Sequence, residues 1–282
     1  MKISPPHLTS TCAVHRDRAF PEVGYGFFGK NIGNCSKYIG DNPGDVLENL
    51  DTIKNLFNAE KLVTLKQIHS NICVAIDSTT AIDPDIEADA LVTATIGIAI
   101  GVLTADCVPI LFWGPSQRKY GENSDERNTL GQNNCNGRSD LCQHRQQPLI
   151  IGAAHCGWKG AVGGIIESTI DKITEVAKCK PEDIHAIIGP AIAVESYEIS
   201  SDFEQNFTNA NDCFLIKNDK KYFDLQKFCR DRLRQMAVPE ENIQWLNINT
   251  YANHSVYFSH RFTQANPNTR QGRNISAICL MR

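Results

Sequence analysis

The stretch GIAIGVLTADCVPILFW, residues 97–113, decides the fold. It holds two apolar runs, Gly97–Leu103 and Val108–Trp113, on either side of a short polar bend. Both runs are short and rich in β-branched or large apolar residues, which favours buried strands over helices. We therefore predict a strand, a sharp turn that contains Asp106 and Cys107, and a second strand.

Further short apolar runs predict more strands along the chain. They are Leu62–Ile68, Ile72–Ile76, Leu149–Ala154, Ile184–Ile188, Lys221–Phe223, Ile243–Ile248, Val256–His260 and Ile275–Leu280. Helical spacing of apolar residues predicts a helix that begins after Asn42, and others over Ala161–Ala177, about Ser201–Phe207 and Leu225–Met236. Several links are as short as hairpins, so we expect a single α/β (α+β) domain over residues 1–282, with mixed β-sheets flanked by helices.

The segment Ser116–Gln147 interrupts this pattern, because it is composed almost entirely of polar residues. Such a segment cannot bury enough apolar surface to offset the entropy that is lost on ordering. We predict a mobile polar insertion at residues 116–147. Within it, Cys135, Cys142 and His144 are conceivable as a second metal site, but their spacing matches no zinc module, and we interpret them as part of the loop.

The composition limits the partners of this 282-residue chain. Its formal net charge is −4, so nothing indicates a nucleic-acid or membrane-surface binder. No apolar run is long enough to span a bilayer, and residues 1–20 contain no apolar core of a secretory signal. The eleven cysteines form no dense framework, so we interpret them as mostly reduced thiols of a cytoplasmic protein.

Three segments each resemble a turn after an apolar strand, and each carries a potential metal ligand. They are Gln67–His69, Thr104–Cys107 and Ala154–Trp158, with the ligands His69, Cys107 and His155. Imidazole and thiolate are ligands that zinc prefers, and three protein ligands leave one coordination position open, as in catalytic sites. Each residue taken singly also has a structural interpretation. Cys107 could be a small core thiol, His155 a hydrogen-bonded core residue, and His69 a surface turn residue.

Residues beside these ligands add further chemistry. A carboxylate between two buried strands needs a polar partner, and orienting a metal-bound histidine is a common role, so we place Asp106 in the catalytic group. Asp106 is also the nearest candidate in sequence for a general acid. The glycine-rich segment after His155 permits close backbone approach, and a helix start there would offer N–H groups to an anion.

The motifs GVLTADCVPIL and GAAHCGWKG closely match the signatures of the YfiH-like family, also called laccase-domain or multicopper-polyphenol-oxidase-like proteins. LKQIHS resembles the first ligand motif of that family, and looser matches extend over most of the chain. They are GYGFF, IGDNPGDVLENL, IIGPAIAVESYEI, NTYANHSVYFSHRF and GRNISAICL. The resemblance implies a layered α/β/β/α sandwich in which His69, Cys107 and His155 coordinate Zn²⁺.

The resemblance also implies an activity. Similar members are purine nucleoside phosphorylases, which convert adenosine, inosine, guanosine or methylthioadenosine and phosphate into the free base and ribose 1-phosphate, with adenosine deamination as a side activity. Purine nucleosides and phosphate are the partners so implied, for a monomer or a small homo-oligomer. From position, we expect Gln67 and Lys159 to contact ribose or phosphate, and Arg261 to supply an anion-binding guanidinium.

The chain departs from the family pattern at several positions. Cys156 replaces a usual Ala, Lys159 a usual Arg, Gly29-Lys30 a frequent Thr-Arg, Asn249 a frequent Cys and His260 a usual Tyr. Lysine cannot reproduce the bidentate geometry of arginine, which bears on phosphate affinity and substrate preference. Cys107 and His155 are also unusually far apart in sequence, and the insertion at residues 116–147 accounts for the excess.

Three other functions stay open. A copper-dependent polyphenol oxidase (laccase) needs many histidines, typically in His-x-His pairs, whereas the eight histidines of this chain form none. A cysteine hydrolase would use Cys107 as nucleophile and His69 or His155 as base, and relatives are linked to editing of peptidoglycan precursors. A non-enzymatic metal-binding module is the third. Metal dependence and phosphate dependence of nucleoside cleavage separate these alternatives.

Overall fold

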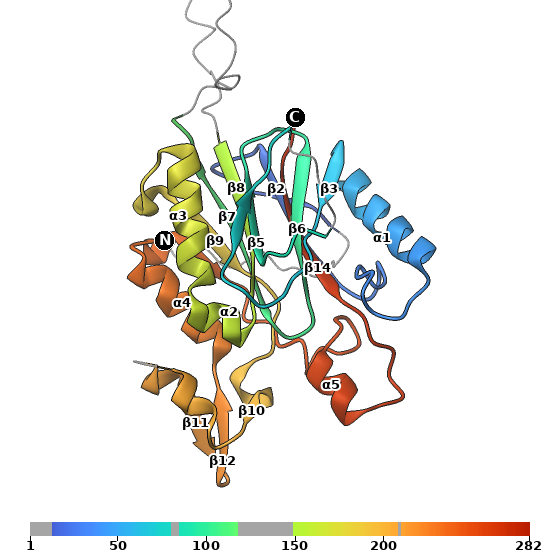
Figure 1. The fold of residues 1–282 in the computed structure, drawn as a ribbon, viewed down its shortest axis with the longest axis vertical. Helices are drawn as coiled ribbons and strands as arrows, with labels where there is room; N and C mark the ends of the chain where they lie inside the picture. The colour runs from blue at the N-terminus through green and yellow to red at the C-terminus, as the bar shows by residue number, and fades with distance from the viewer. Residues whose placement is uncertain (1–12, 80–84, 118–148, 208–209) are drawn as a thin grey trace, which may run out of the picture.

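Two β-sheets lie face to face, and helices cover their outer faces (Figure 1). The structure is a computed structural model that describes residues 13–79, 85–117, 149–207 and 210–282. Helices α3 and α4 cover one sheet and α1 covers the other, so the four layers follow the order α/β/β/α (Figure 1). The layered sandwich predicted from the sequence is confirmed.

The first sheet has six strands and is mixed. Its order is β13 (Ile243–Trp245), β9 (His185–Ile188), β7 (Val108–Pro115), β8 (Leu149–Cys156), β5 (Ala90–Thr93) and β4 (Cys73–Ala75). The central strand β7 pairs antiparallel with both β8 and β9, whereas the outer pairs β9–β13 and β4–β5 are parallel. The prediction of mixed sheets is therefore confirmed.

The second sheet has five strands. Its order is β1 (His15–Arg16), β2 (Val23–Phe28), β14 (Asn274–Leu280), β6 (Ile98–Thr104) and β3 (Lys61–Val63). The two strands of the stretch 97–113 thus belong to different sheets, because β6 lies here and β7 lies in the first sheet. The bend between them carries the chain across the sandwich. A smaller sheet contains β10 (Glu198–Ile199), β12 (Lys220–Phe223) and β11 (Phe214–Lys217).

Five α-helices are present among the described residues. They are α1 (Pro43–Leu56), α2 (Trp158–Gly163), α3 (Ile165–Ala177), α4 (Leu225–Gln235) and α5 (His260–Ala265). The helix predicted to begin after Asn42 is α1, and Asn42 caps it, because its Oδ1 accepts a hydrogen bond of 2.9 Å from the Gly44 N–H. The single helix predicted over Ala161–Ala177 is in fact two helices, since Gly164 takes a left-handed φ of 95° and breaks it.

Side chains of β7 alternate between two hydrophobic layers. Ile110 and Phe112 pack with residues of α3 and α4, whereas Leu111 and Trp113 pack in the layer between the two sheets. Helix α1 closes a third layer, in which Phe57 packs against the second sheet. Because both faces of β7 are buried, the strand reads as a continuous apolar run rather than an alternating one.

Some predicted elements were wrong. The strand predicted over Val256–His260 is absent, and α5 begins at His260 instead. The Ser259 hydroxyl caps this helix, because it accepts a hydrogen bond of 3.1 Å from the Phe262 N–H. The helix predicted at about Ser201–Phe207 is a 3₁₀-helix over Phe203–Asn206. Four further 3₁₀-helices occur, at Pro181–Asp183, Val194–Ser196, Asn211–Cys213 and Glu240–Asn242.

Most of the predicted insertion at 116–147 lies outside the described residues, as do Cys135, Cys142 and His144. It begins where β7 ends, and Pro115 of β7 pairs directly with Leu149 of β8. The two strands that flank it are therefore immediate neighbours. Within the described ranges, no helix is long and apolar enough to cross a membrane.

Candidate metal centre

His69, Cys107 and His155 converge at one end of the first sheet. One ligand atom from each lies within 4.8 Å of the others. The His69 Nε2 and Cys107 Sγ atoms are 3.8 Å apart, and the two imidazole rings meet edge to face at a centroid distance of 4.8 Å. His155 is buried, Cys107 is half-buried and His69 is exposed. The cluster therefore has one open side.

The register of β7 and β8 places two of these residues. Val108 pairs with Cys156 and Pro109 with His155, so Cys107, which directly precedes β7, lies at the end of β8 that carries His155. Gly157 leaves room for the third residue. A Cβ atom at Gly157 would lie 2.4 Å from His69 Cδ2 and 3.2 Å from Cys107 Sγ, which no larger residue could accommodate without displacing the cluster.

A buried carboxylate that the sequence analysis missed connects the two histidines. Asp89 is fully buried and its Oδ1 accepts hydrogen bonds from His155 Nδ1 at 2.8 Å and the His69 N–H at 3.0 Å. Its Oδ2 accepts from the Ser70 N–H at 2.6 Å, the Ser70 hydroxyl at 2.7 Å and the Ile68 N–H at 3.2 Å. These bonds hold the turn in which His69 has a left-handed φ of 61°.

The same hydrogen bonds set the charges of the site. Burial alone would raise the pKa of Asp89, but hydrogen bonds from His155 and Ser70 outweigh it and lower that pKa to about 2. An ionised Asp89 can accept but not donate, so His155 Nδ1 carries a proton, which leaves Nε2 as the ligand atom. A carboxylate that orients a histidine in this way is typical of metal sites.

Cys107 and His155 each favour the charged form of the other. Burial opposes ionisation of Cys107, but the positive His155 and hydrogen bonds from both histidines lower its pKa to about 6. Burial likewise opposes protonation of His155, yet the Cys107 thiolate and Asp89 raise its pKa to about 9. A thiolate at neutral pH is what a metal ligand or a nucleophile requires.

The donor set fits a catalytic zinc site. Two imidazole nitrogens and one thiolate leave a fourth tetrahedral position open. Ordinary zinc bond lengths put a nitrogen and a sulfur ligand of one ion roughly 3.6 Å apart, close to the 3.8 Å between His69 and Cys107. A His₂Cys set is also found in copper sites, so the residues alone do not select between the two metals.

The other predicted site residues lie elsewhere or are already engaged. The Gln67 side-chain amide forms two hydrogen bonds with the backbone of Leu103. Its Nε2 donates to the Leu103 carbonyl at 2.7 Å, and its Oε1 accepts from the Leu103 N–H at 2.7 Å. Lys159 is exposed and its Nζ lies 5.6 Å from the Trp158 ring centroid. Arg261 donates from Nη1 to the Glu198 carbonyl at 2.8 Å. Gln67 lines the cavity described below, whereas Lys159 and Arg261 are not among its lining residues.

Asp106 does not orient a histidine as the sequence predicts. Its Oδ1 accepts from the Thr250 hydroxyl at 2.6 Å and its Oδ2 from the Arg261 N–H at 2.7 Å, while its backbone has a left-handed φ of 86°. Asp106 therefore ties the bend of residues 104–107 to the start of α5. The orienting role belongs to Asp89.

A cavity of about 410 Å³ opens onto the cluster. It is lined by Ser36, Tyr38, Ile39, Leu65, Lys66, Gln67, His69, Leu103, Ala105, Cys107, His155, His260 and Arg273. A volume of this size suits a small-molecule ligand. Sequence reasoning missed Tyr38 and Arg273, because neither lies in a motif next to a ligand.

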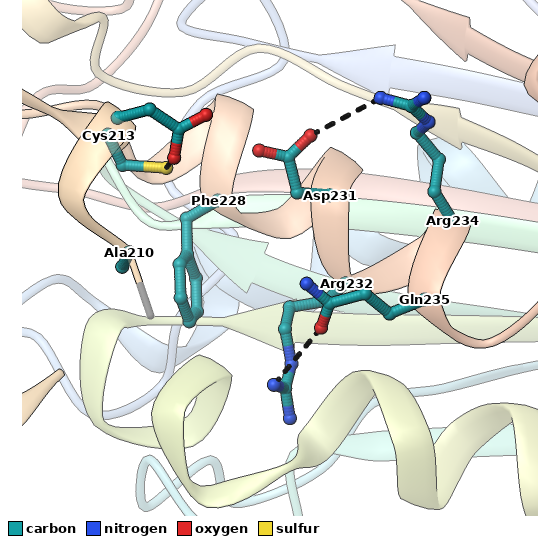
Figure 2. Close-up of a pocket in the computed structure, with 8 residues that line it drawn as sticks. Ala210, Cys213, Phe228, Asp231, Arg232, Arg234 and Gln235 are labelled. Carbon is teal, nitrogen blue, oxygen red and sulfur yellow. Dashed lines mark hydrogen bonds and ion pairs between the residues drawn. The ribbon is translucent and has the colours of Figure 1, made fainter. Parts of the chain in front are cut away.

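A larger cavity of about 680 Å³ lies beside α4 (Figure 2), and it shares no lining residue with the cavity at the cluster. Asp212, Cys213 and Asp231 meet there at metal-ligand spacing. The Lys227 ammonium already bonds both carboxylates, at 2.5 and 2.6 Å. We therefore interpret this group as an ion-pair network rather than a metal site.

Comparison with known proteins identifies the family of this chain. The family model described as multi-copper polyphenol oxidoreductase laccase matches residues 23–122 and 141–281. A purine nucleoside phosphorylase of Rickettsia prowazekii is 31% identical over 250 residues, which cover 85% of this chain and 88% of the relative. The purine nucleoside phosphorylase YfiH of Escherichia coli is 28% identical over 236 residues, 81% of this chain and 80% of its own.

Solved structures share the fold. A Neisseria meningitidis protein superposes with a TM-score of 0.70 at 25% identity, covering 93% of this chain and 95% of its own. YfiH of Bacillus licheniformis superposes with a TM-score of 0.76 at 22% identity, covering 98% of each chain. Fold and cluster together define a laccase-domain protein with a His–Cys–His centre. The chain belongs to the multi-copper polyphenol oxidoreductase laccase family, in its YfiH-like group.

Proposed function

We propose that this protein is a zinc-dependent purine nucleoside phosphorylase whose metal ligands are His69, Cys107 and His155. The observation that carries the proposal is the open His–Cys–His cluster that lines a cavity of about 410 Å³. Relatives that carry the name purine nucleoside phosphorylase support it. Zinc, when bound, supplies a Lewis acid with one open coordination position.

The proposed reaction cleaves the glycosidic bond of adenosine, inosine, guanosine or methylthioadenosine with phosphate and yields the free base and ribose 1-phosphate. Asp89 keeps His155 in the tautomer whose Nε2 faces the cluster. Tyr38, Ile39 and Leu65 give the cavity an apolar surface against which a purine base can pack. Deamination of adenosine at the same centre belongs to the proposal as a side activity.

A second candidate, a cysteine hydrolase, rests on the ionised Cys107. A thiolate beside two imidazoles is the arrangement of an activated nucleophile, with His69 or His155 as the base. Peptidoglycan-precursor editing belongs to this class. Copper-dependent phenol oxidation is a third candidate, supported by the family description and by the His₂Cys donor set.

One experiment separates the three. We would measure the metal content of the purified protein and incubate it with adenosine, inosine, guanosine and methylthioadenosine, with and without phosphate. Phosphate-dependent release of free base that disappears in C107A and H155A supports the phosphorylase. Normal phosphorolysis by H155A would refute the assigned site. Copper-dependent oxidation of phenols without nucleoside turnover would favour the oxidase, and metal-free cleavage of amides or esters the hydrolase.

Other properties follow as expectations. All eight cysteines among the described residues are free thiols, which supports a cytoplasmic location. We expect purine nucleosides and phosphate as partners, without nucleic acid or membrane, and a monomer or a small homo-oligomer. Light scattering of the purified protein would determine the oligomeric state.

A further inference from the structure

Apart from the proposed metal ligands, the cationic side chains that line this cavity are Lys66 and Arg273, and they differ in how their charge is balanced. Lys66 forms an ion pair of 2.7 Å with Glu87. Arg273 has no carboxylate within 4.0 Å in the part of the chain that the structure describes, and its side chain donates from Nη1 to the Gly272 carbonyl at 2.9 Å. Of these two cations, Arg273 is therefore the one whose charge can be neutralised by a ligand.

In the described part of the chain, the surroundings of Arg273 partly bury its guanidinium without supplying a negative group that pairs with it directly. The side chain is half-buried, and this burial lowers its pKa, although an arginine stays protonated at any physiological pH. The negative groups that act on it are Cys107 and Asp106. Cys107 belongs to the cluster, and both carboxylate oxygens of Asp106 are engaged by Thr250 and the Arg261 N–H. Neither balances the guanidinium by direct pairing.

Backbone hydrogen bonds attach Arg273 to residues 34 and 35, which precede another residue that lines the same cavity. The Arg273 N–H donates to Asn34 Oδ1 at 2.8 Å, and its carbonyl accepts from the Cys35 N–H at 3.2 Å. Asn34 is fully buried and also bonds the backbone of Ser36 in both directions, at 2.9 and 3.0 Å. Because Ser36 lines the cavity too, Asn34 fixes Arg273 and this loop relative to each other.

We propose that Arg273 binds the phosphate that attacks the nucleoside, in the cavity that it shares with His69, Cys107 and His155. This inference rests on the proposed function. A guanidinium can give two parallel hydrogen bonds to an oxyanion, and a partly desolvated cation gains most from such a partner. Lys159 and Arg261, which the sequence suggested for this role, do not line the cavity. Arg273 replaces them as the anion-binding residue.

The test compares R273Q and R273K with the matched control R270Q. Arg270 lies three positions earlier on an exposed surface and pairs with Asp41 at 3.1 Å, outside the cavity. For each protein in its metal-loaded form, we would measure binding of inorganic phosphate by calorimetry. We would also measure the KM for phosphate at saturating inosine and the KM for inosine at saturating phosphate.

We expect R273Q to weaken phosphate binding and to raise the KM for phosphate by about 10- to 100-fold, because a charged hydrogen-bond pair is lost. The KM for inosine should change less than about twofold, R273K should lie between R273Q and the wild type, and R270Q should match the wild type. If R273Q does not fold, R273K provides the test instead. It retains the charge but loses the bidentate hydrogen bonds of the guanidinium, so its KM for phosphate should still rise.

Several results would overturn the inference. They are unchanged phosphate binding in R273Q, a loss that falls on the KM for inosine instead, and a wild-type protein that binds no phosphate. Phosphorolysis that is insensitive to R273Q would remove this inference but leave the proposed function standing. Phosphate binding that depends on Arg273 in a protein that cleaves no nucleoside would refute the proposed function, and it would leave Arg273 as an anion-binding residue without a role in phosphorolysis.

Discussion

Asp89 Oδ1 lies 2.8 Å from Nδ1 of His155, and the same carboxylate holds the turn that carries His69. One fully buried side chain therefore controls the tautomer of one proposed ligand and the backbone position of another. This relationship links residues from three separate segments of the chain. Its removal should affect the metal centre more than the fold around it.

We predict that D89N lowers metal affinity by about 10- to 100-fold. An asparagine offers one acceptor oxygen and an NH₂ donor, so it cannot accept all five hydrogen bonds that the two Asp89 oxygens receive from His155, His69, Ser70 and Ile68. Competition with a chelator measures the affinity. S70A, which removes one of the donors to Asp89 and the acceptor of the Ile72 N–H, is the milder control. Metal binding by D89N at wild-type strength would argue against the positioning role.

We predict that metal binding releases about one proton per site between pH 6 and 9. In that range the free site holds a Cys107 thiolate, with a pKa of about 6, and a protonated His155, with a pKa of about 9. The metal needs the thiolate and a neutral imidazole, so affinity should rise about tenfold per pH unit there, rise more steeply below pH 6, and level off above pH 9. Calorimetry in buffers of different ionisation enthalpy counts the protons. An affinity that does not change with pH would contradict the charge states assigned to Cys107 and His155.

We predict that G157A disrupts the cluster whereas G163A does not. The new Cβ at position 157 would lie 2.4 Å from the His69 ring, but at position 163 the nearest atom, Asn71 Cβ, is 4.0 Å away. Displacing His69 should lower metal affinity at least about tenfold. Metal content after dialysis against a weak chelator distinguishes the two variants. Equal retention would show that His69 is not a required ligand.

We predict that Asp106 acts chiefly on stability. D106A loses the hydrogen bonds from Thr250 and the Arg261 N–H and places alanine at a φ of 86°, so the free energy of unfolding should fall by about 2–4 kcal/mol. D106N tolerates this φ and keeps an acceptor, so it should lose less. Urea denaturation measures both. If D106N were as stable as the wild type but inactive, the catalytic role first assigned to Asp106 would be the better explanation.

The sequence predicted the elements whose signals are local. The buried strands β7 and β8 are continuous apolar runs, and α1 has its cap and proline in order, so each is visible within a short window. The three candidate ligands were also found, because His69 and His155 directly follow a predicted apolar run and Cys107 directly precedes one. Asp89 precedes the apolar run of β5 in the same way, and this signal could have revealed it.

The sequence could not predict contacts that depend on tertiary packing between distant segments. Val256–His260 carries strand-forming residues, but the Ser259 cap starts α5 there, and Arg261 then donates to the Glu198 carbonyl instead of entering the cavity. Arg273 reaches the cavity because a buried asparagine distant in sequence holds its backbone. Neither orientation follows from spacing along the chain, since both depend on how distant segments pack.

The ladder between β7 and β8 begins with Val108 opposite Cys156 and ends with Pro115 opposite Leu149. The ligands sit at the first end, and the polar stretch enters at the second, roughly 20 Å away at the usual rise per strand residue. The interval between Cys107 and His155 along the chain can therefore drift in evolution while their separation in space stays constant. Searches for relatives that require a fixed cysteine-to-histidine interval would overlook such chains. The same junction offers protein engineers a place to graft a reporter without touching the ligands.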